Sequence, residues 1–176
     1  MQALVSIATE RLRLEPFDLA DIGAEYLGWL NDSVVTRFSN QRFRTHTVES
    51  ARRYVASFSE SGNVFLAIRM ADTGRMIGTL TAYVTEWHRT ADMGLMIGDR
   101  TCWGCGYGLE AWSALMRHLF DARALRKVTG GTVRPNLGMQ RIMERSGMHL
   151  EAVRVRQEII EGMEEDVLYF ARFAAR

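Results

Sequence analysis

Residues that cross-link a chain or restrict its backbone are scarce in this sequence. Its 176 residues include two cysteines, two prolines and four histidines. Cys102 and Cys105 lie too close together to cross-link a domain of this size, and we interpret them as small, partly buried thiols in a reducing compartment. Neither the cysteines nor the scattered histidines have the spacing of a metal site. We therefore expect a fold that depends on neither disulfides nor a metal.

The sequence also lacks a strong net charge and a long apolar run. Its 22 basic and 21 acidic side chains give a net charge of +1, which provides no broad field for nucleic acid or anionic lipid. No run approaches the roughly 20 apolar residues of a membrane span. Residues 1–10 lack the basic and apolar regions of a secretion signal. We expect a cytoplasmic protein without nucleic-acid or membrane partners, whose ligands are selected by a pocket.

Length and hydrophobic periodicity predict one domain with a mixed sheet covered by helices. The chain is 47% apolar, long enough for one core and too short for two ordinary domains, so residues 1–176 form a single unit. Alternating apolar residues predict strands at 9–17, 64–70, 76–84, 91–97, 127–133, 150–159 and 166–173. Helical spacing predicts helices at 18–30, 48–58, 106–122 and 136–145.

A glycine-rich segment, Trp-Gly-Cys-Gly-Tyr-Gly at 103–108, joins a predicted strand to a predicted helix. Glycines at alternate positions let the backbone approach an anion closely, and the helix start adds unpaired N–H groups and a positive dipole end. The segment therefore predicts a main-chain cradle for a pyrophosphate group. The alternative is that these glycines only permit a tight strand-to-helix turn.

Two other motifs overlap the same segment. Residues 106–111 match the dinucleotide pattern G-x-G-x-x-G/A, and residues 102–105 match the C-x-x-C of a thiol redox helix. The dinucleotide fold places its turn early and an acidic residue about 20 positions later, whereas here the turn comes late and the next strand ends at Arg134. A redox helix does not need Gly106 and Gly108. We therefore favour the pyrophosphate cradle.

Three segments resemble the GNAT superfamily of acetyl-CoA-dependent N-acetyltransferases. Thr-Glu-Arg-Leu-Arg-Leu at 9–14 is similar to the opening of the branch that contains the ribosomal-protein N-terminal acetyltransferases. Residues 97–111 resemble the cofactor motif of that branch, usually written with Trp-Gly-Lys-Gly-Tyr. Residues 136–148 resemble its second motif, an Asn that opens a helix ending in Gly-Phe. The resemblance covers nearly the whole chain, and two motifs in the right order are more specific than either alone.

The resemblance implies a GNAT-like α/β (α+β) fold and acetyl-CoA as the cofactor. That fold is a mixed, mostly antiparallel sheet of about seven strands flanked by about four helices, with a splayed central parallel pair formed by strands 91–97 and 127–133. The pantetheine arm of coenzyme A would lie in the resulting gap and the pyrophosphate on the glycine-rich segment. The implied cofactor-binding residues are Met96, Ile97, Gly98, Trp103, Gly104, Cys105, Gly106, Tyr107, Gly108, Asn136, Met139 and Met143.

The sequence departs from the resembled pattern at three of these positions. Cys105 replaces the common Lys or Arg, which removes a side-chain charge and keeps the backbone N–H. Met139 stands where the branch often has Ser. Met143 stands where many members have a Tyr that protonates the departing thiol, so we expect water, or no acid at all, in that role.

Acetyl transfer to an amine requires a group that accepts the amine's proton, because amines are mostly protonated at neutral pH. The candidate bases are Glu86, His88 and Asp92, which lie in or before strand 91–97. A backbone N–H near Met96 is the expected donor to the developing oxyanion. We expect direct transfer in a ternary complex, with an acetyl-cysteine intermediate as the alternative.

The resemblance permits several acceptors: a protein N-terminus, a nucleotide-linked amino sugar or a small amine. The segments 29–32, 37–38, 41–43 and 85–90 look similar to acyltransferases of surface-sugar biosynthesis, which favours the amino sugar. Its expected contacts are Trp29, Arg37, Phe38 and Arg42, with the arginines suited to a phosphate and phenylalanine to a base. A non-catalytic acyl-CoA-binding module is the alternative of another class. A homodimer formed through the final strands is a further expectation.

Overall fold

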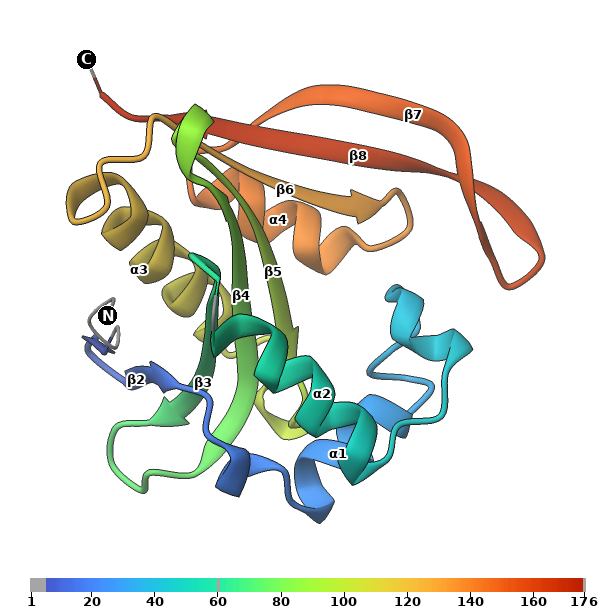
Figure 1. Ribbon diagram of the computed structural model, residues 1–176. Helices are drawn as coiled ribbons and strands as arrows, with labels where there is room; N and C mark the ends of the chain where they lie inside the picture. The colour runs from blue at the N-terminus through green and yellow to red at the C-terminus, as the bar shows by residue number, and fades with distance from the viewer. Residues whose placement is uncertain (1–5, 60, 176) are drawn as a thin grey trace.

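The computed structural model describes residues 6–59 and 61–175. These residues form an eight-stranded sheet in the order β1-β2-β3-β4-β5-β6-β8-β7 (Figure 1). The strands are β1 (Ile7–Ala8), β2 (Leu12–Pro16), β3 (Val64–Met70), β4 (Met76–Thr85), β5 (Thr90–Ile97), β6 (Lys127–Val133), β7 (His149–Ile160) and β8 (Met163–Phe173). All neighbours are antiparallel except β5 and β6, so the predicted mixed sheet is confirmed.

Four α-helices cover the two faces of the sheet. They are α1 (Ala24–Asn31), α2 (Val48–Ser59), α3 (Tyr107–Asp121) and α4 (Leu137–Arg145). Residues of α3 and α4 pack into the larger core, and residues of α1 and α2 pack into a second core on the other face. Within the described residues, no helix is both long and apolar enough to cross a membrane.

Strand β3 shows why the sheet is buried on both faces. Leu66 and Ile68 belong to the larger core, whereas Phe65 and Ala67 belong to the second core. Successive side chains of a strand point to opposite faces, so an unbroken apolar run can serve two cores at once. The first five residues of β3 are accordingly buried.

Two predicted elements near the N-terminus are divided in the structure. The predicted helix 18–30 is a short 3-10 turn, Leu19–Asp21, followed by α1, because a capping box between Asp18 and Asp21 closes the turn and Gly23 caps the next helix. The predicted strand 9–17 begins later, at Leu12. Residues 9–11 instead form a turn between β1 and β2.

The predicted splay between the central parallel strands is present. Strands β5 and β6 pair only at Thr90↔Lys127, Ala91↔Val128 and Asp92↔Thr129. Beyond this point β5 continues beside β4 and β6 continues beside β8. Figure 1 shows the result, with β5 running downward and β6 running to the right. We call the space between them the gap, with its closed end at Thr90 and its vertex at Asp92.

The β7–β8 hairpin bends back toward the connection between α1 and α2. Residues 155–157 bulge opposite Asp166, whose Oδ1 accepts a hydrogen bond from the Arg156 N–H at 2.9 Å. Bulges bend and twist a strand pair, which explains the curved hairpin in Figure 1. Most of β7 is exposed and β7 lies at the edge of the sheet. The expected homodimer through this edge stays a prediction.

Candidate active site

The glycine-rich segment forms the loop between β5 and α3, and we call residues 98–108 the cofactor loop. Gly104 and Gly106 adopt φ angles of 74° and 84°, the left-handed region that glycine enters without a steric penalty. Gly106 is also the residue that caps α3. The two left-handed residues turn the chain sharply from the strand end into the helix start.

The start of α3 presents backbone donors suited to an anion. Its first intrahelical hydrogen bond runs from the Glu110 N–H to the Gly106 carbonyl at 3.1 Å. The N–H groups of Tyr107, Gly108 and Leu109 therefore precede the ladder and have no partner within the helix. Such groups, reinforced by the helix dipole, bind phosphate oxygens. The arrangement fits the predicted pyrophosphate cradle.

An ion pair fixes the beginning of the cofactor loop. Asp99 accepts hydrogen bonds from the Thr101 hydroxyl at 2.6 Å and from the Thr101 N–H at 2.9 Å, and it pairs with Arg75. The Thr101 hydroxyl and Arg75 outweigh the opposing effect of burial and lower the pKa of Asp99 to about 2. The carboxylate is therefore charged at neutral pH, and the loop enters its turn from a fixed point.

Two glycines of the loop are needed for close packing. A Cβ on Gly98 would overlap the indole ring of Trp29, and a Cβ on Gly108 would lie 3.0 Å from Ile142 and 3.3 Å from Leu95. Trp29 is only 8% exposed and belongs to the second core. This corrects its predicted role in acceptor binding, because an indole that covers the backbone of Gly98 has little surface left for a ligand.

The backbone of β5 directs alternate residues toward the gap. Gly98 donates its N–H to the Ile77 carbonyl of β4 at 2.9 Å. Residues two apart in a strand point their amides to the same side, so Met96 also faces β4, whereas Leu95 and Ile97 face the gap. The predicted backbone contacts of Met96 and Gly98 with the pantetheine arm therefore need correction. The backbone groups of Ile97 face the gap as predicted, and those of Leu95 also face it.

Trp103 ties the cofactor loop to this edge of the gap. Its indole Nε1 donates to the Ile97 carbonyl at 2.8 Å, and 44% of the residue is exposed. The exposed indole surface can cover a ligand that passes from the gap to the loop. Cys105 is exposed and Cys102 is buried, and both are free thiols.

Asp92 lies at the vertex of the gap. Its Oδ1 accepts a hydrogen bond from the Thr129 hydroxyl of β6 at 2.7 Å, and its strand partner on β4 is Tyr83. The Asp92 side chain shares a face with Gly94 and Met96, on the side of α1 and α2, and it is exposed. A carboxylate therefore stands where the two central strands part.

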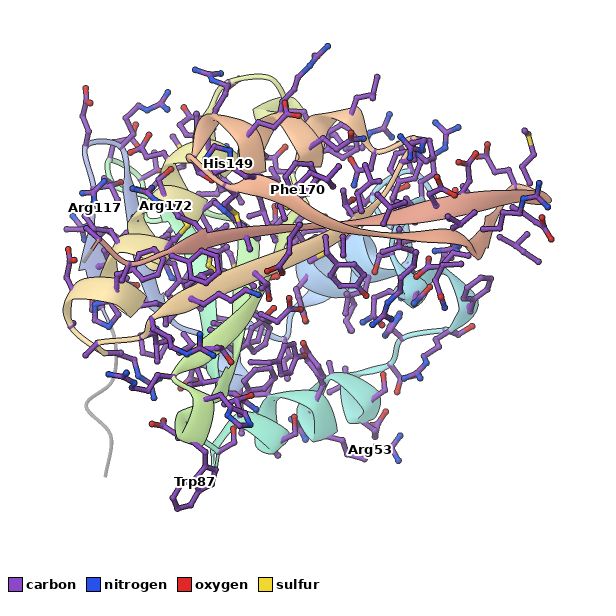
Figure 2. The ribbon with its side chains drawn as sticks, turned by 90° about the horizontal axis from the view of Figure 1, so that it is seen from above. Arg53, Trp87, Arg117, His149, Phe170 and Arg172 are labelled. Atoms are coloured by element: carbon purple, nitrogen blue, oxygen red, sulfur yellow. The ribbon has the colours of Figure 1, made fainter. Side chains whose placement is uncertain are left out.

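The other two predicted bases lie beyond the closed end of the gap. Glu86 pairs with Arg123 at 2.7 Å, and the His88 carbonyl accepts a hydrogen bond from Arg126 at 2.8 Å. Trp87 between them is 95% exposed and projects away from the body of the molecule (Figure 2). Thr90 lies seven positions, about 23 Å, from Ile97 at the cofactor-loop end of β5. Of the three candidates, the structure brings only Asp92 to the gap.

The α4 side of the gap carries the second motif. Asn136 caps α4, and its Oδ1 accepts a hydrogen bond from the Met139 N–H at 3.3 Å. Its amide NH₂ remains available to a ligand. Met143 is fully buried, and its sulfur would lie 3.2 Å from a Cβ on Gly130. This position therefore fills the core and offers no proton, as expected from the missing tyrosine.

The predicted acceptor residues of the α1–α2 connection contact the β7–β8 hairpin. Arg37 binds Glu161 with two hydrogen bonds of 2.9 Å. Arg42 donates to the Ile159 carbonyl at 3.1 Å and lies 3.8 Å from Glu158. Phe38 packs against a small cluster that includes residues of β6 and β8. Both arginines therefore already have carboxylate partners. Together with Phe38, they hold the α1–α2 connection against the hairpin.

Several residues near the vertex had no role in the sequence-based hypothesis. The hydroxyls of Tyr54 and Tyr83 are 2.8 Å apart, and burial, together with Tyr83, raises the pKa of Tyr54. Tyr169 stands beside Gly131, and Arg154 lies 4.8 Å from the centre of its ring. These residues come from four separate elements. Of these residues, Tyr83 is the strand partner of Asp92, a pairing that the register of the sheet creates and that no local pattern in the sequence indicates.

Comparisons with known proteins agree with this architecture. The sequence model of the family described as "Acetyltransferase (GNAT) domain" matches residues 11–149. A protein of Bacillus subtilis strain 168 described as a probable N-acetyltransferase, YjcK, is 27% identical over 127 residues, which cover 69% of this chain and 70% of that protein.

Solved structures of acetyltransferases share the fold. A GNAT-family acetyltransferase from Bacillus anthracis is 20% identical, with a TM-score of 0.81 over 96% of this chain and 98% of that one. Spermidine N-acetyltransferase from Vibrio cholerae, in complex with CoA and spermine, is 16% identical, with a TM-score of 0.84 over 94% and 96%. RimL, an α-N-protein acetyltransferase of a ribosomal protein, in complex with coenzyme A, is 17% identical, with a TM-score of 0.82 over 97% and 98%.

The family match contains both strands of the splayed pair, the cofactor loop and the second motif. It covers well over half of the chain. The chain therefore belongs to the GNAT acetyltransferase family and is an acetyltransferase that uses acetyl-CoA.

Proposed function

We propose that this acetyltransferase moves the acetyl group directly to a primary amine in a ternary complex, with Asp92 accepting the proton of the amine. The observation that carries the proposal is the position of Asp92 at the vertex, between Thr129 and Tyr83. Acetyl-CoA supplies the acetyl group as a reactive thioester. Residues of the chain bind the two substrates and accept the proton of the amine.

The donor-binding residues lie along one continuous path. The N–H groups at the start of α3 would hold the pyrophosphate, and the gap-facing backbone of Leu95 and Ile97 would pair with the amides of the pantetheine arm. Ile97 lies five positions along β5 from Asp92, a length of about 16 Å. An extended arm that starts at the loop therefore ends beside Asp92. A backbone N–H of this edge, such as that of Leu95, is suited to stabilise the developing oxyanion.

Asp92 is suited to a base by its surroundings. Its hydrogen bond from Thr129 fixes one carboxylate oxygen and leaves the second free to accept a proton, directly or through one water. It is exposed on the face that α1, α2 and their connection partly cover, where an acceptor can approach. The buried Met143 offers no acid on the α4 side, so the departing thiolate takes its proton from water or leaves unprotonated.

The acceptor we propose is a small cationic amine or a peptide N-terminus. The expected contacts of a nucleotide-linked amino sugar include Arg37 and Arg42 as phosphate ligands, and both arginines are paired with glutamates of the hairpin. Asp92 and its strand partner Tyr83 instead favour a positively charged group, through ion pairing and cation–π contact. Among the comparisons, one structure holds spermine and another is of an acetyltransferase of a ribosomal protein.

The test is acceptor-dependent release of the CoA thiol. A panel of polyamines, small amines, peptides with varied N-termini and nucleotide amino sugars is incubated with enzyme and acetyl-CoA. We expect turnover with a cationic amine or a peptide, and intersecting lines in two-substrate kinetics. Absence of turnover with the whole panel, despite acetyl-CoA binding, would contradict the proposed acceptor class.

The cysteines separate direct transfer from a covalent intermediate. Replacing both Cys102 and Cys105 by alanine should preserve most of kcat, because neither lies at the vertex of the gap. Complete loss of turnover in the double variant, with intact binding of coenzyme A, would instead indicate an acetyl-cysteine route.

A further inference from the structure

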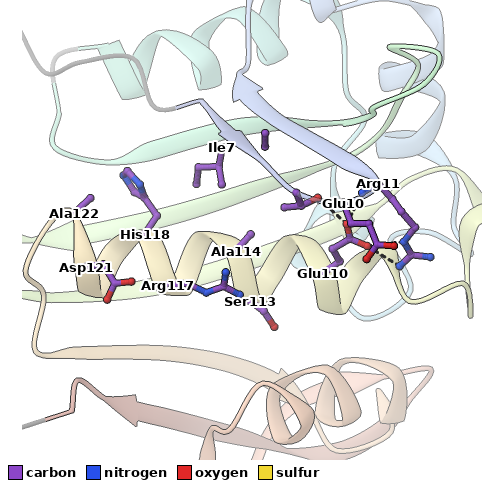
Figure 3. Close-up of a pocket in the computed structure, with 12 residues that line it drawn as sticks. Ile7, Glu10, Arg11, Glu110, Ser113, Ala114, Arg117, His118, Asp121 and Ala122 are labelled. Carbon is purple, nitrogen blue, oxygen red and sulfur yellow. Dashed lines mark hydrogen bonds and ion pairs between the residues drawn. The ribbon is translucent and has the colours of Figure 1, made fainter.

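Arg11 reaches the cofactor loop from the turn between β1 and β2. Its Nη1 donates to the Cys105 carbonyl at 3.1 Å, and its guanidinium lies 4.5 Å from the centre of the Tyr107 ring. A Cβ on Gly106 would lie 3.4 Å from its Nη2. Figure 3 shows Arg11 and Glu110 together at one end of a groove of about 760 Å³ between the N-terminal segment and α3.

The same turn holds both oxygens of the Glu110 carboxylate. Oε1 accepts hydrogen bonds from the Thr9 hydroxyl at 2.7 Å and from the Arg11 N–H at 2.9 Å. Oε2 accepts from the Arg11 Nε and pairs with its Nη2, each at 2.7 Å. Burial opposes ionisation of Glu110, but these hydrogen bonds outweigh it and lower the pKa. Glu110 is therefore charged and paired at neutral pH.

The hydrogen bond to Cys105 has a directional consequence. In a trans peptide the carbonyl oxygen and the following N–H point to opposite sides. Arg11 draws the Cys105 carbonyl toward the N-terminal turn, so the N–H of Gly106 points away from Arg11. This amide comes directly before the free N–H groups of the α3 start. A bond to one carbonyl thus orients a donor of the cradle.

The ion pair has an electrostatic consequence. Glu110 lies in the first turn of α3, where a negative charge stabilises the helix but opposes a second anion bound at the same helix end. Its side chain is only 17% exposed, so solvent screens this charge poorly. Arg11 neutralises the carboxylate. Without Arg11, a pyrophosphate group would meet an uncompensated negative charge.

We propose that Arg11 is a positioning residue of the donor site, which aims the Gly106 N–H into the pyrophosphate cradle and neutralises Glu110. This inference rests on the proposed function, in which the cofactor loop holds the pyrophosphate. Arg11 acts through the loop and through Glu110, so its removal weakens donor binding and leaves the transfer step intact.

The test compares two acetyl donors. Arg11→Met is assayed with acetyl-CoA and with acetyl-pantetheine, which lacks the pyrophosphate and the nucleotide. We expect kcat/KM for acetyl-CoA to fall about tenfold through KM, while kcat/KM for acetyl-pantetheine changes by less than about twofold. Arg13→Met is the matched control, because Arg13 lies in the same segment and also donates to a backbone carbonyl, that of Ala71. Arg13→Met should change kcat/KM for neither donor.

Two further variants separate the two effects of Arg11. Arg11→Lys restores the charge without the planar fork and should recover part of the lost affinity. Glu110→Gln placed on Arg11→Met removes the uncompensated charge and should also recover part of it. Thermal melting of each variant checks that the fold persists.

The outcomes are distinct. An equal fall in kcat/KM for the two donors, or no fall for acetyl-CoA, would overturn the role of Arg11. A double variant with a lower kcat/KM for acetyl-CoA than Arg11→Met alone would also overturn it. A wild-type enzyme that transfers acetyl from neither donor would instead contradict the proposed function. An Arg11→Met enzyme that melts early but keeps the wild-type KM for acetyl-CoA would assign Arg11 a purely structural role.

Discussion

The proposed donor side and the proposed acceptor side of this enzyme are built in different ways. The donor side is nearly continuous in sequence, because β5, the cofactor loop and the start of α3 follow one another. The acceptor side gathers Asp92, Thr129, Tyr83 and the α1–α2 connection from separate elements. A continuous site depends on local backbone geometry, whereas a gathered site depends on the register of the whole sheet. The two sides should therefore respond differently to substitution.

The largest effect on catalysis should come from a substitution on the proposed acceptor side. Asp92→Asn keeps the size of the side chain and removes the proposed proton acceptor, so kcat should fall at least about 100-fold with little change in the KM for acetyl-CoA. Steady-state kinetics with a saturating amine measures it. The matched control is Glu86→Gln. Glu86 pairs with Arg123 at the closed end of the gap, so this variant should keep kcat within about twofold of wild type. The reverse pattern would move the base to Glu86.

The next effect concerns the stability of the donor side. The pKa of Asp99 is lowered to about 2, chiefly by the Thr101 hydroxyl. A lowered carboxylate pKa stabilises the fold above the unfolded-state pKa, and this contribution is lost as the pH falls through the folded-state value. Asp99→Asn should therefore cost about 2 kcal/mol at pH 7, and its difference from wild type should shrink between about pH 4 and pH 2. Denaturant unfolding across this range measures the difference in stability, and a difference independent of pH would argue against a lowered pKa of Asp99.

A smaller effect, on the KM for acetyl-CoA, should come from a substitution within the proposed pyrophosphate cradle. Gly104 and Gly162 both have left-handed φ angles, and a Cβ on either would meet no atom within 4 Å. Alanine at either position should cost about 1 kcal/mol of stability. Only Gly104→Ala should also raise the KM for acetyl-CoA, by about tenfold, because it distorts the cradle. Equal KM values in the two variants would mean that the glycines serve the turn alone.

The smallest effect should come from the contact between the α1–α2 connection and the hairpin. Arg42→Ala removes the hydrogen bond to the Ile159 carbonyl and should raise the KM for the amine about threefold, because the acceptor side loses a fixed wall. The KM for acetyl-CoA should not change. Arg156→Gln, which removes an exposed ion pair with Glu164 in the same hairpin, is the control. A donor-side effect of Arg42→Ala would show that the two sides are not separable.

Much of the donor side could be predicted from the sequence. The alternation of β5, the glycines at 104, 106 and 108 and the cap at Asn136 are local signals, and the structure places each where its pattern predicts. The orientation of individual amides could not be predicted, because which residues of β5 face the gap depends on their pairing with β4. Met96 and Gly98 were misassigned for this reason.

The acceptor side was less predictable for a related reason. Trp29 lies on the same face of α1 as the buried Tyr26 and Leu30, and the tertiary fold packs it against Gly98, a contact that the sequence alone does not indicate. Arg37 and Arg42 looked like phosphate ligands until the hairpin supplied glutamates from more than 100 residues away. Such partners lie far apart in the chain, and a single sequence carries no signal that links them. The contacts of Arg11 with Glu110 and Cys105 were missed in the same way.

The indole of Trp29 against the backbone of Gly98 joins the two halves of the enzyme mechanically. Gly98 begins the cofactor loop, and α1, which carries Trp29, leads directly into the segment that holds Arg37 and Arg42. A flat, rigid ring in van der Waals contact transmits a displacement instead of absorbing it. If donor occupancy shifts the start of the loop, the acceptor wall shifts with it, and the enzyme has a physical reason to receive its two substrates in a fixed order.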